Sequence, residues 1–249
     1  MTVYPDAKIN IGLNVLGKRP DGYHNLETLF VHYDGFRDEL TVEPSGEFSI
    51  DISPCSWDPL KDLTVRAYEM LKADFSLPPV RIALRKGIPV GAGLGGGSSD
   101  AAWMLRTLNE MFSLGLGKDD LAAYASRLGS DCAFFVYDCP MFGQGRGEIL
   151  SPFGIDFSGY DFRVEVPARV AVSTAEAYRG VSMYCGRPLK EILALPIGQW
   201  RGVLSNSFEP SVFAAFPQIE ALKQRLYDDG AVYASMSGSG SSVFGIFKR

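Results

Sequence analysis

Histidine and cysteine are scarce in this sequence, and their scarcity argues against a metal centre. There are two histidines and four cysteines among 249 residues. The cysteines stand at positions 55, 132, 139 and 185 and form no CxxC pair, the spacing typical of zinc sites. We therefore predict no zinc site and four reduced thiols, as in a cytoplasmic protein.

Basic clusters and long apolar runs are also missing. The net charge is −5, and no stretch concentrates Lys and Arg, so neither nucleic acid nor a membrane is expected as a partner. No apolar run approaches the roughly 20 residues that a membrane helix needs, and the N-terminal segment lacks the pattern of a secretory signal. With 46% hydrophobic and 21% charged residues, the composition predicts a soluble globular protein in the cytoplasm.

Glycine, by contrast, is concentrated at one place. Five glycines lie within residues 91–97, between a short apolar run and a stretch, 98–112, with the periodicity of a helix. Glycine lets the backbone turn tightly and approach a ligand closely. The free amides and the positive dipole end of the following helix attract anions. A simple chain reversal does not require so many glycines, so this segment predicts a phosphate-binding loop.

Two familiar phosphate motifs match the chain only superficially. Residues 91–96 fit the dinucleotide fingerprint GxGxxG, but no second strand ends in an acidic residue roughly 20 positions later. Residues 12–18 fit the start of a P-loop, but Arg19 stands where Ser or Thr should hold magnesium, and a turn follows. We expect neither a dinucleotide fold nor a P-loop.

Hydrophobic periodicity predicts a mixture of strands and helices along the chain. Strands are expected at 3–16, 26–32, 37–43, 48–52, 80–84, 132–137 and 160–166, and on both sides of a second small-residue loop at 237–242. Helices are expected at 62–73, 98–112, 118–128, 174–178, after 188, and at 219–227. The Ser-Pro-Phe-Gly turn at 151–154 divides the chain into expected domains 1–150 and 151–249.

Two charged residues lie beside apolar ones. Lys8 stands between Ala7 and Ile9 in an expected strand, and Asp131 precedes the apolar run 132–136. Taken alone, each has an ordinary interpretation, namely a surface lysine on an edge strand and an aspartate that caps a turn or helix.

Three separated segments together make the chain similar to the GHMP kinase superfamily. They are 7–10 (AKIN) with 17–24 (GKRPDGYH), then 89–102 (PVGAGLGGGSSDAA), and finally 235–240 (SMSGSG). The match spans nearly the whole chain in the expected order. It implies an α+β fold of two domains, the N-terminal one binding ATP, with the active site in the cleft between them. It also implies a left-handed βαβ crossover, against the general right-handed preference.

Within the superfamily, the segments resemble the members whose acceptor carries a cytidine diphosphate group. The implied reaction transfers the γ-phosphoryl group of ATP to the tertiary 2-hydroxyl of a methylerythritol unit, in the non-mevalonate route to isoprenoid precursors. Magnesium is expected to arrive with ATP, and Ser99 is the nearest candidate ligand in the chain. A monomer or a weak homodimer is expected.

The resemblance also implies roles for individual residues. Asp131 would accept the substrate proton, and Lys8 would keep it ionised and orient the hydroxyl. The expected ATP contacts are Lys86, Pro89, Val90, Gly91, Ala92, Gly93, Leu94, Gly95, Gly96, Gly97, Ser98 and Ser99. The expected substrate contacts are Asn10, Tyr23, His24, Thr174 and Tyr178, and the residues that support the loop are Ser237, Gly238, Ser239 and Gly240.

Two positions depart from the family pattern. Asp62 stands where the family usually has an asparagine near the adenine. Cys132-Ala133 stands where the family usually has Val-Pro after the aspartate that corresponds to Asp131. Two alternatives stay open at this point. A kinase of homoserine, mevalonate or a sugar would have no use for the Tyr23-His24 turn, and an inactive nucleotide-binding protein would need neither Lys8 nor Asp131.

Overall fold

A computed structural model describes residues 1–168, 170–181, 183–184 and 186–249, so Cys185 lies outside the described residues. The chain forms two compact units that interleave along the sequence. Unit 1 is Met1–Ala7, Phe36–Val90 and Gly95–Asp138, and unit 2 is Lys8–Gly35, Gly91–Leu94 and Cys139–Arg249. The division into domains 1–150 and 151–249 stays a prediction. None of the described helices combines the length and hydropathy needed to cross a membrane.

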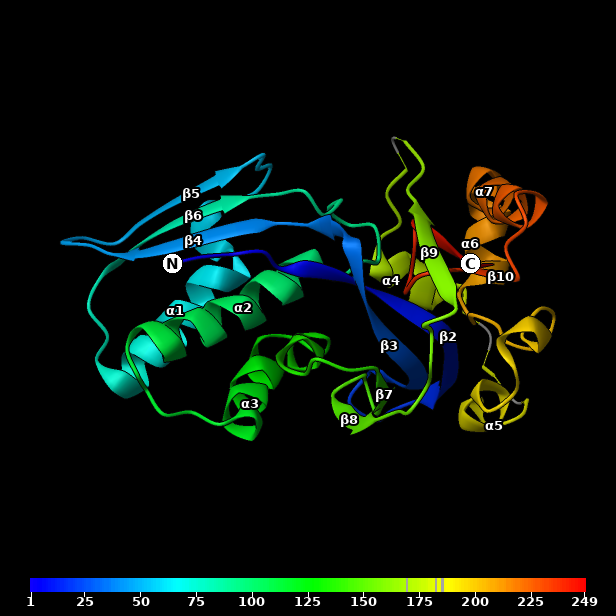
Figure 1. Ribbon diagram of the computed structural model, residues 1–249, viewed down its shortest axis with the longest axis horizontal. Helices are drawn as coiled ribbons and strands as arrows, with labels where there is room; N and C mark the ends of the chain where they lie inside the picture. Colours follow the sequence, from blue (N-terminus) through cyan, green and yellow to red (C-terminus); the bar gives the residue numbers. More distant parts are fainter. Residues whose placement is uncertain (169, 182, 185) are drawn as a thin grey trace. The chain divides into compact units, whose positions relative to one another are not determined.

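Unit 1 is built on a four-stranded sheet with helices against one face (Figure 1). Its strands, in spatial order, are β1 (Thr2–Val3), β4 (Glu39–Pro44), β6 (Val80–Arg85) and β5 (Ser49–Ser53). β6 pairs antiparallel with β4 and parallel with β5, to which α1 (Leu63–Phe75) connects it. This is a βαβ crossover; its left-handed sense stays a prediction. Successive residues of a strand point to opposite faces of the sheet. In β4 and β6 the buried apolar residues therefore share one face, and the exposed charged residues lie on the other.

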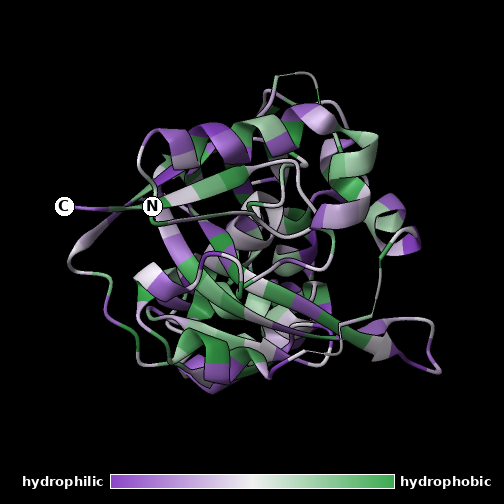
Figure 2. Cartoon of the chain, turned by 90° about the vertical axis from the view of Figure 1, so that its right-hand side faces the viewer, coloured by the Kyte–Doolittle hydropathy of each residue, from purple (hydrophilic) through white to green (hydrophobic). Residues whose placement is uncertain are grey.

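Three helices of unit 1 pack through apolar faces. They are α1, α2 (Gly96–Met111) and α3 (Lys118–Leu128), with short 3₁₀ helices at Pro59–Lys61 and Cys132–Val136. In α2 the apolar residues Ala101, Met104, Leu105 and Leu108 recur at three- and four-residue spacing and are fully buried, as the periodicity predicts, and Met111 at the end of the helix is half-buried. Figure 2 shows hydrophilic and hydrophobic residues sharing the helical ribbons. At the start of α1, Asp62 accepts hydrogen bonds from the backbone and hydroxyl of Thr64 at 2.9 and 2.7 Å.

Unit 2 contains two further sheets. One has the order β2 (Asp6–Lys18), β3 (His24–Arg37), β7 (Met141–Gln144) and β8 (Ile149–Pro152), and the other has the order β10 (Tyr233–Met236), β11 (Val243–Lys248) and β9 (Tyr160–Glu165). The helices are α4 (Thr174–Arg179), α5 (Leu189–Leu193), α6 (Glu209–Ala215) and α7 (Pro217–Asp228), with a 3₁₀ helix at Ile197–Gln199. α7 packs on β10 and β11 around a core that includes Phe208, Ile219 and Leu226.

Most expected elements are present, shifted by a few residues at their ends. The strand expected at 132–137 is wrong, because these residues form the 3₁₀ helix Cys132–Val136 with every side chain buried. A short run in which every residue is apolar shows no hydrophobic periodicity, so its sequence does not distinguish a buried strand from a buried helical turn. The structure also contains α6, whose start follows a polar stretch with the composition of a loop.

Candidate functional site

The glycine loop leads into a helix whose N-terminus is open to a ligand. α2 begins at Gly96, two residues before the serines expected to start it, and Gly95 at its N-cap has a φ of +73°. Glycine adopts this left-handed conformation without steric cost and supplies no capping side chain. The first-turn amides therefore have no side-chain acceptor at the N-cap, as an anion site requires. The fully buried Ser99 hydroxyl has no hydrogen-bond partner among the described residues.

A buried ion triad contacts the segment that precedes this loop in the chain. Lys86 pairs with both Asp38 and Asp100, and all three side chains are at most 4% exposed. Asp38 also accepts hydrogen bonds from the backbone amides of Gly87 at 2.6 Å and Ile88 at 2.8 Å. The triad therefore fastens the start of α2 to the segment that enters the loop. Sequence reasoning missed Asp38 and Asp100, and a contact between Lys86 and ATP stays a prediction.

Electrostatics in the triad follow from burial. Burial raises the pKa of Asp100 well above its usual range; Lys86 opposes this rise, and Asp38 adds to it. Burial alone would lower the pKa of Lys86, but the two carboxylates outweigh it and raise that pKa. Lys86 therefore stays protonated and provides the positive charge for two buried acidic side chains.

In unit 2, the predicted catalytic lysine is buried rather than exposed. Lys8 is 3% exposed on β2, so its interpretation as a surface lysine is wrong. Its ammonium donates to the carbonyl oxygen of Gly93 at 2.9 Å and to the Asn10 side-chain oxygen. The Ser237 hydroxyl donates to the same Gly93 oxygen at 3.1 Å and accepts from the backbone N–H of Asn10 at 3.2 Å. The three motifs recognised in the sequence therefore meet at Gly93.

Close approach explains why glycine stands at position 93. Gly93 has a φ of +78°, and a Cβ there would lie 2.2 Å from the carbonyl oxygen of Ser237. In the third motif, Gly238 has a φ of +57°, and a Cβ on it would meet the side chains of Asn10 and Lys8 at 3.3 and 3.5 Å. Asn206, which sequence reasoning missed, donates to the carbonyl oxygens of Met236 and Gly238 at 2.9 and 2.8 Å.

Two contacts in unit 2 involve residues that are expected to bind the substrate. The His24 and Tyr178 rings stack with centroids 4.8 Å apart and planes inclined by 20°. The hydroxyls of Thr174 and Ser239 lie 3.2 Å apart. Tyr23 is 55% exposed, and the Arg146 guanidinium lies over its ring at 4.8 Å. An exposed aromatic ring can offer a face to a flat base.

Asp131 lies in unit 1, partly buried, at the N-cap of the 3₁₀ helix Cys132–Val136. Its side chain makes no capping hydrogen bond to that helix, so the interpretation of Asp131 as the cap of a helix is wrong, and capping of a turn stays a prediction. Burial raises the pKa of the Cys132 thiol to about 11, although a hydrogen bond with Ser98 opposes the rise. This contact joins the first turn of α2 to the residue after Asp131. The pairing of Asp131 with Lys8 stays a prediction.

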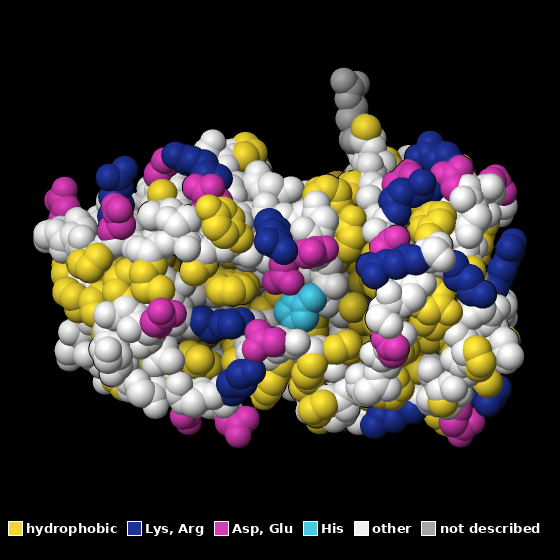
Figure 3. Space-filling view, viewed as in Figure 1, with side chains coloured by type: hydrophobic (Ala, Val, Ile, Leu, Met, Phe, Trp, Pro, Cys, Tyr) yellow, Lys and Arg dark blue, Asp and Glu magenta, His cyan; other side chains and the backbone are white. Residues whose placement is uncertain are grey.

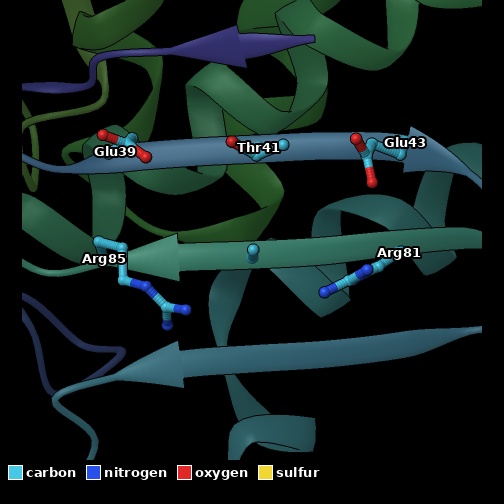
Figure 4. A pocket seen from close by; sticks show the side chains of 6 residues that line it. Glu39, Thr41, Glu43, Arg81 and Arg85 are labelled. Atoms are coloured by element: carbon cyan, nitrogen blue, oxygen red, sulfur yellow. The ribbon is translucent and has the colours of Figure 1, made fainter.

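A second feature of the described residues is a surface depression outside the glycine loop. A polar depression lies on the outer face of β4 and β6, lined by Glu39, Thr41, Glu43, Arg81, Ala83 and Arg85 (Figure 4). Its acidic residues stand opposite its arginines across the two strands, so it has no excess of either charge. Positive and negative side chains are likewise interspersed on the face in Figure 3. No group of three His, Cys, Asp or Glu residues in the described ranges could hold a metal.

Comparison with known proteins agrees with this geometry. The family models for the GHMP kinases N terminal domain and the GHMP kinases C terminal match residues 62–139 and 189–249. The 4-diphosphocytidyl-2-C-methyl-D-erythritol kinase of Bacteroides fragilis is 47% identical over 253 residues, which cover 99% of this chain and 92% of that protein. The chain belongs to the GHMP kinase family. The corresponding kinase of Cytophaga hutchinsonii is 43% identical and covers 99% of this chain and 92% of that protein.

Solved structures agree with this family membership. A crystal structure of 4-(cytidine 5'-diphospho)-2C-methyl-D-erythritol kinase has a TM-score of 0.82 and 34% identity, covering 98% of this chain and 89% of that one. A homoserine kinase from Cytophaga hutchinsonii has a TM-score of 0.71 at 15% identity, covering 99% and 85%. The second likeness concerns the fold alone. The α+β GHMP kinase fold expected from the sequence is confirmed.

Proposed function

We propose that this GHMP kinase transfers the γ-phosphoryl group of ATP to the tertiary 2-hydroxyl of 4-diphosphocytidyl-2-C-methyl-D-erythritol. The product would serve the non-mevalonate route to isoprenoid precursors. The observation that carries this proposal is the meeting of Lys8, Asn10, Gly93 and Ser237 at one point, in a chain 47% identical to a kinase of that name. An inactive nucleotide-binding protein would not need to bury a lysine beside the loop.

The residues would divide the work between binding and chemistry. The loop from Pro89 to Ser99 would bind the phosphates of ATP through its amides and the uncapped N-terminus of α2. Asp131 would accept the proton of the acceptor hydroxyl. Lys8 would neutralise charge near the reacting oxygens, because phosphoryl transfer depends mainly on positioning and charge stabilisation. The stacked His24 and Tyr178 rings, with Tyr23, support recognition of a cytosine base.

Magnesium would arrive with ATP and neutralise the phosphate charge. The buried, unpartnered hydroxyl of Ser99 fits an oxygen ligand of the kind magnesium prefers. The ion usually takes most of its ligands from phosphates and water, so a single side chain in the loop is enough.

The test is to follow ADP release and identify the product by ³¹P NMR, with purified wild-type protein, ATP and 4-diphosphocytidyl-2-C-methyl-D-erythritol. We expect a phosphomonoester at the tertiary carbon. Asp131→Asn should lower kcat by at least about a hundredfold, the usual range for loss of a general base, while ATP binding stays within about twofold. Normal turnover in this variant would show that Asp131 is not the base.

A further inference from the structure

A buried threonine fixes the orientation of the amide that contacts Lys8. Thr28 lies on β3 with no exposed surface. Its hydroxyl donates to the carbonyl oxygen of Gly12 at 2.7 Å. The Thr28 hydroxyl oxygen accepts from the Asn10 side-chain nitrogen at 3.0 Å, and the Asn10 side-chain oxygen accepts from Lys8. Gly12, Thr28, Asn10 and Lys8 therefore form one continuous chain of hydrogen bonds, all within unit 2.

The donors and acceptors of the four groups allow only one direction for this series of hydrogen bonds. A peptide carbonyl accepts and never donates, so the single hydroxyl hydrogen of Thr28 must point to Gly12. The hydroxyl oxygen is then an acceptor, and the group that faces it must be the NH₂ of Asn10. This leaves the Asn10 oxygen toward Lys8, whose ammonium can only donate. A reversed amide would put N–H groups against an ammonium and an oxygen against the Thr28 oxygen.

Gly12, where this series of hydrogen bonds begins, has an unusual backbone conformation. Gly12 has a φ of +69°, which other residues rarely adopt. Beyond it, Leu13 exchanges backbone hydrogen bonds with Ser205 and Ser207 at 3.0 and 2.8 Å. The Gly12 carbonyl oxygen, just before Leu13, is the one that the Thr28 hydroxyl binds.

We propose that Thr28 is a positioning residue, which orients the Asn10 amide and through it the ammonium of Lys8. This inference rests on the proposed function, in which Lys8 acts in phosphoryl transfer. Thr28 touches neither nucleotide nor acceptor in this scheme. Its role is to leave Asn10 a single orientation, so that the ammonium is held between the Asn10 oxygen and the Gly93 carbonyl.

The kinetic test compares two substitutions at position 28. Thr28→Val keeps the shape and removes the hydroxyl, and we expect kcat to fall about ten- to a hundredfold with the KM for ATP unchanged within about twofold, because small misplacements of a catalytic group cost up to about that much. Thr28→Ser keeps the hydroxyl and should retain at least about half of the wild-type kcat. Thr107→Val is the control. It also removes a buried threonine hydroxyl, but the Thr107 hydroxyl, unlike that of Thr28, has no partner among the described residues. Unchanged kcat in Thr28→Val overturns the proposal.

A double-mutant cycle shows whether Thr28 acts through Asn10. In the Asn10→Ala background, Thr28→Val should cost no more than about a further twofold in kcat, because the group it orients is gone. Losses that multiply to the full product of the single effects would contradict the proposal.

A measurement without turnover separates this inference from the proposed function. The Asn10 side-chain NH₂ signals can be assigned in a ¹H–¹⁵N spectrum by their disappearance in Asn10→Ala. In Thr28→Val these protons should shift and exchange faster with solvent, whereas Thr28→Ser and Thr107→Val should leave them protected. Unchanged signals in Thr28→Val overturn the proposal even if the wild type is an active kinase. Altered signals support it even if the acceptor proves to be a different one.

Discussion

Replacing Lys86 by methionine is the sharpest test of the ion triad that Lys86 forms with Asp38 and Asp100. The substitution keeps an unbranched side chain and removes the ammonium that Asp38 and Asp100 share. Two carboxyl groups that are at most 1% exposed would lose their counter-charge. Breaking a buried ion pair from one side costs about 3–5 kcal/mol, because the remaining charge stays out of water.

Thermal unfolding measures this loss directly. For a chain of this size, each kcal/mol lowers Tm by about 2–4 °C, so Lys86→Met should unfold about 6–20 °C below the wild type at pH 7. Lys61→Met is the matched control. The Lys61 side chain is 81% exposed and lies 3.9 Å from its partner Asp58, so its loss should change the free energy of unfolding by at most about 0.5 kcal/mol.

The pH dependence gives the same experiment a second readout. Burial already raises the pKa of Asp100, and removing Lys86 takes away the group that opposes the rise. An acid whose pKa is higher in the folded state favours folding while both states are protonated, and this advantage is lost as pH rises. The deficit of Lys86→Met should therefore shrink as pH falls from 7 toward 4. A deficit no larger than that of Lys61→Met, or one that grows on acidification, would refute the reasoning.

Two further predictions concern the loop and a thiol near Asp131. Gly93→Ala should lower the free energy of unfolding by about 2 kcal/mol or more, because it adds a Cβ 2.2 Å from the Ser237 carbonyl oxygen at positive φ. Gly97→Ala, whose Cβ would meet nothing closer than 3.9 Å, should be neutral or stabilising in the same denaturant titration; equal losses would contradict the close-approach argument. With its pKa near 11, Cys132 should be about one part in a thousand thiolate at pH 8. Iodoacetamide followed by peptide mass mapping should therefore label the exposed Cys139 much faster than Cys132, and equal rates would show that the thiol is not shielded.

Local patterns predicted the parts of the site that depend on neighbours in sequence. The glycines at 91–97 and the periodicity of 98–112 predicted a loop and a helix, and both are present. The burial of Lys8 was not predictable in this way, because it depends on Gly93, which is 85 residues distant. The family resemblance indicated that these segments belong together.

Other residues left no signal in the sequence. Asp38, Thr28 and Asn206 belong to no recognisable motif, and only the folded chain brings them to the carbonyls, amides and charges that they bind. The same holds for the 3₁₀ helix Cys132–Val136, whose conformation is decided by its burial rather than by any period.

The central claim is that this chain phosphorylates an acceptor carrying cytidine diphosphate. The most direct measurement is ADP release with ATP and three acceptors in parallel, namely 4-diphosphocytidyl-2-C-methyl-D-erythritol, homoserine and mevalonate. We predict turnover with the first acceptor alone. Turnover with homoserine or mevalonate instead would contradict the roles given to Tyr23, His24 and Tyr178, and ATP binding without turnover of any acceptor would contradict the proposal of a kinase.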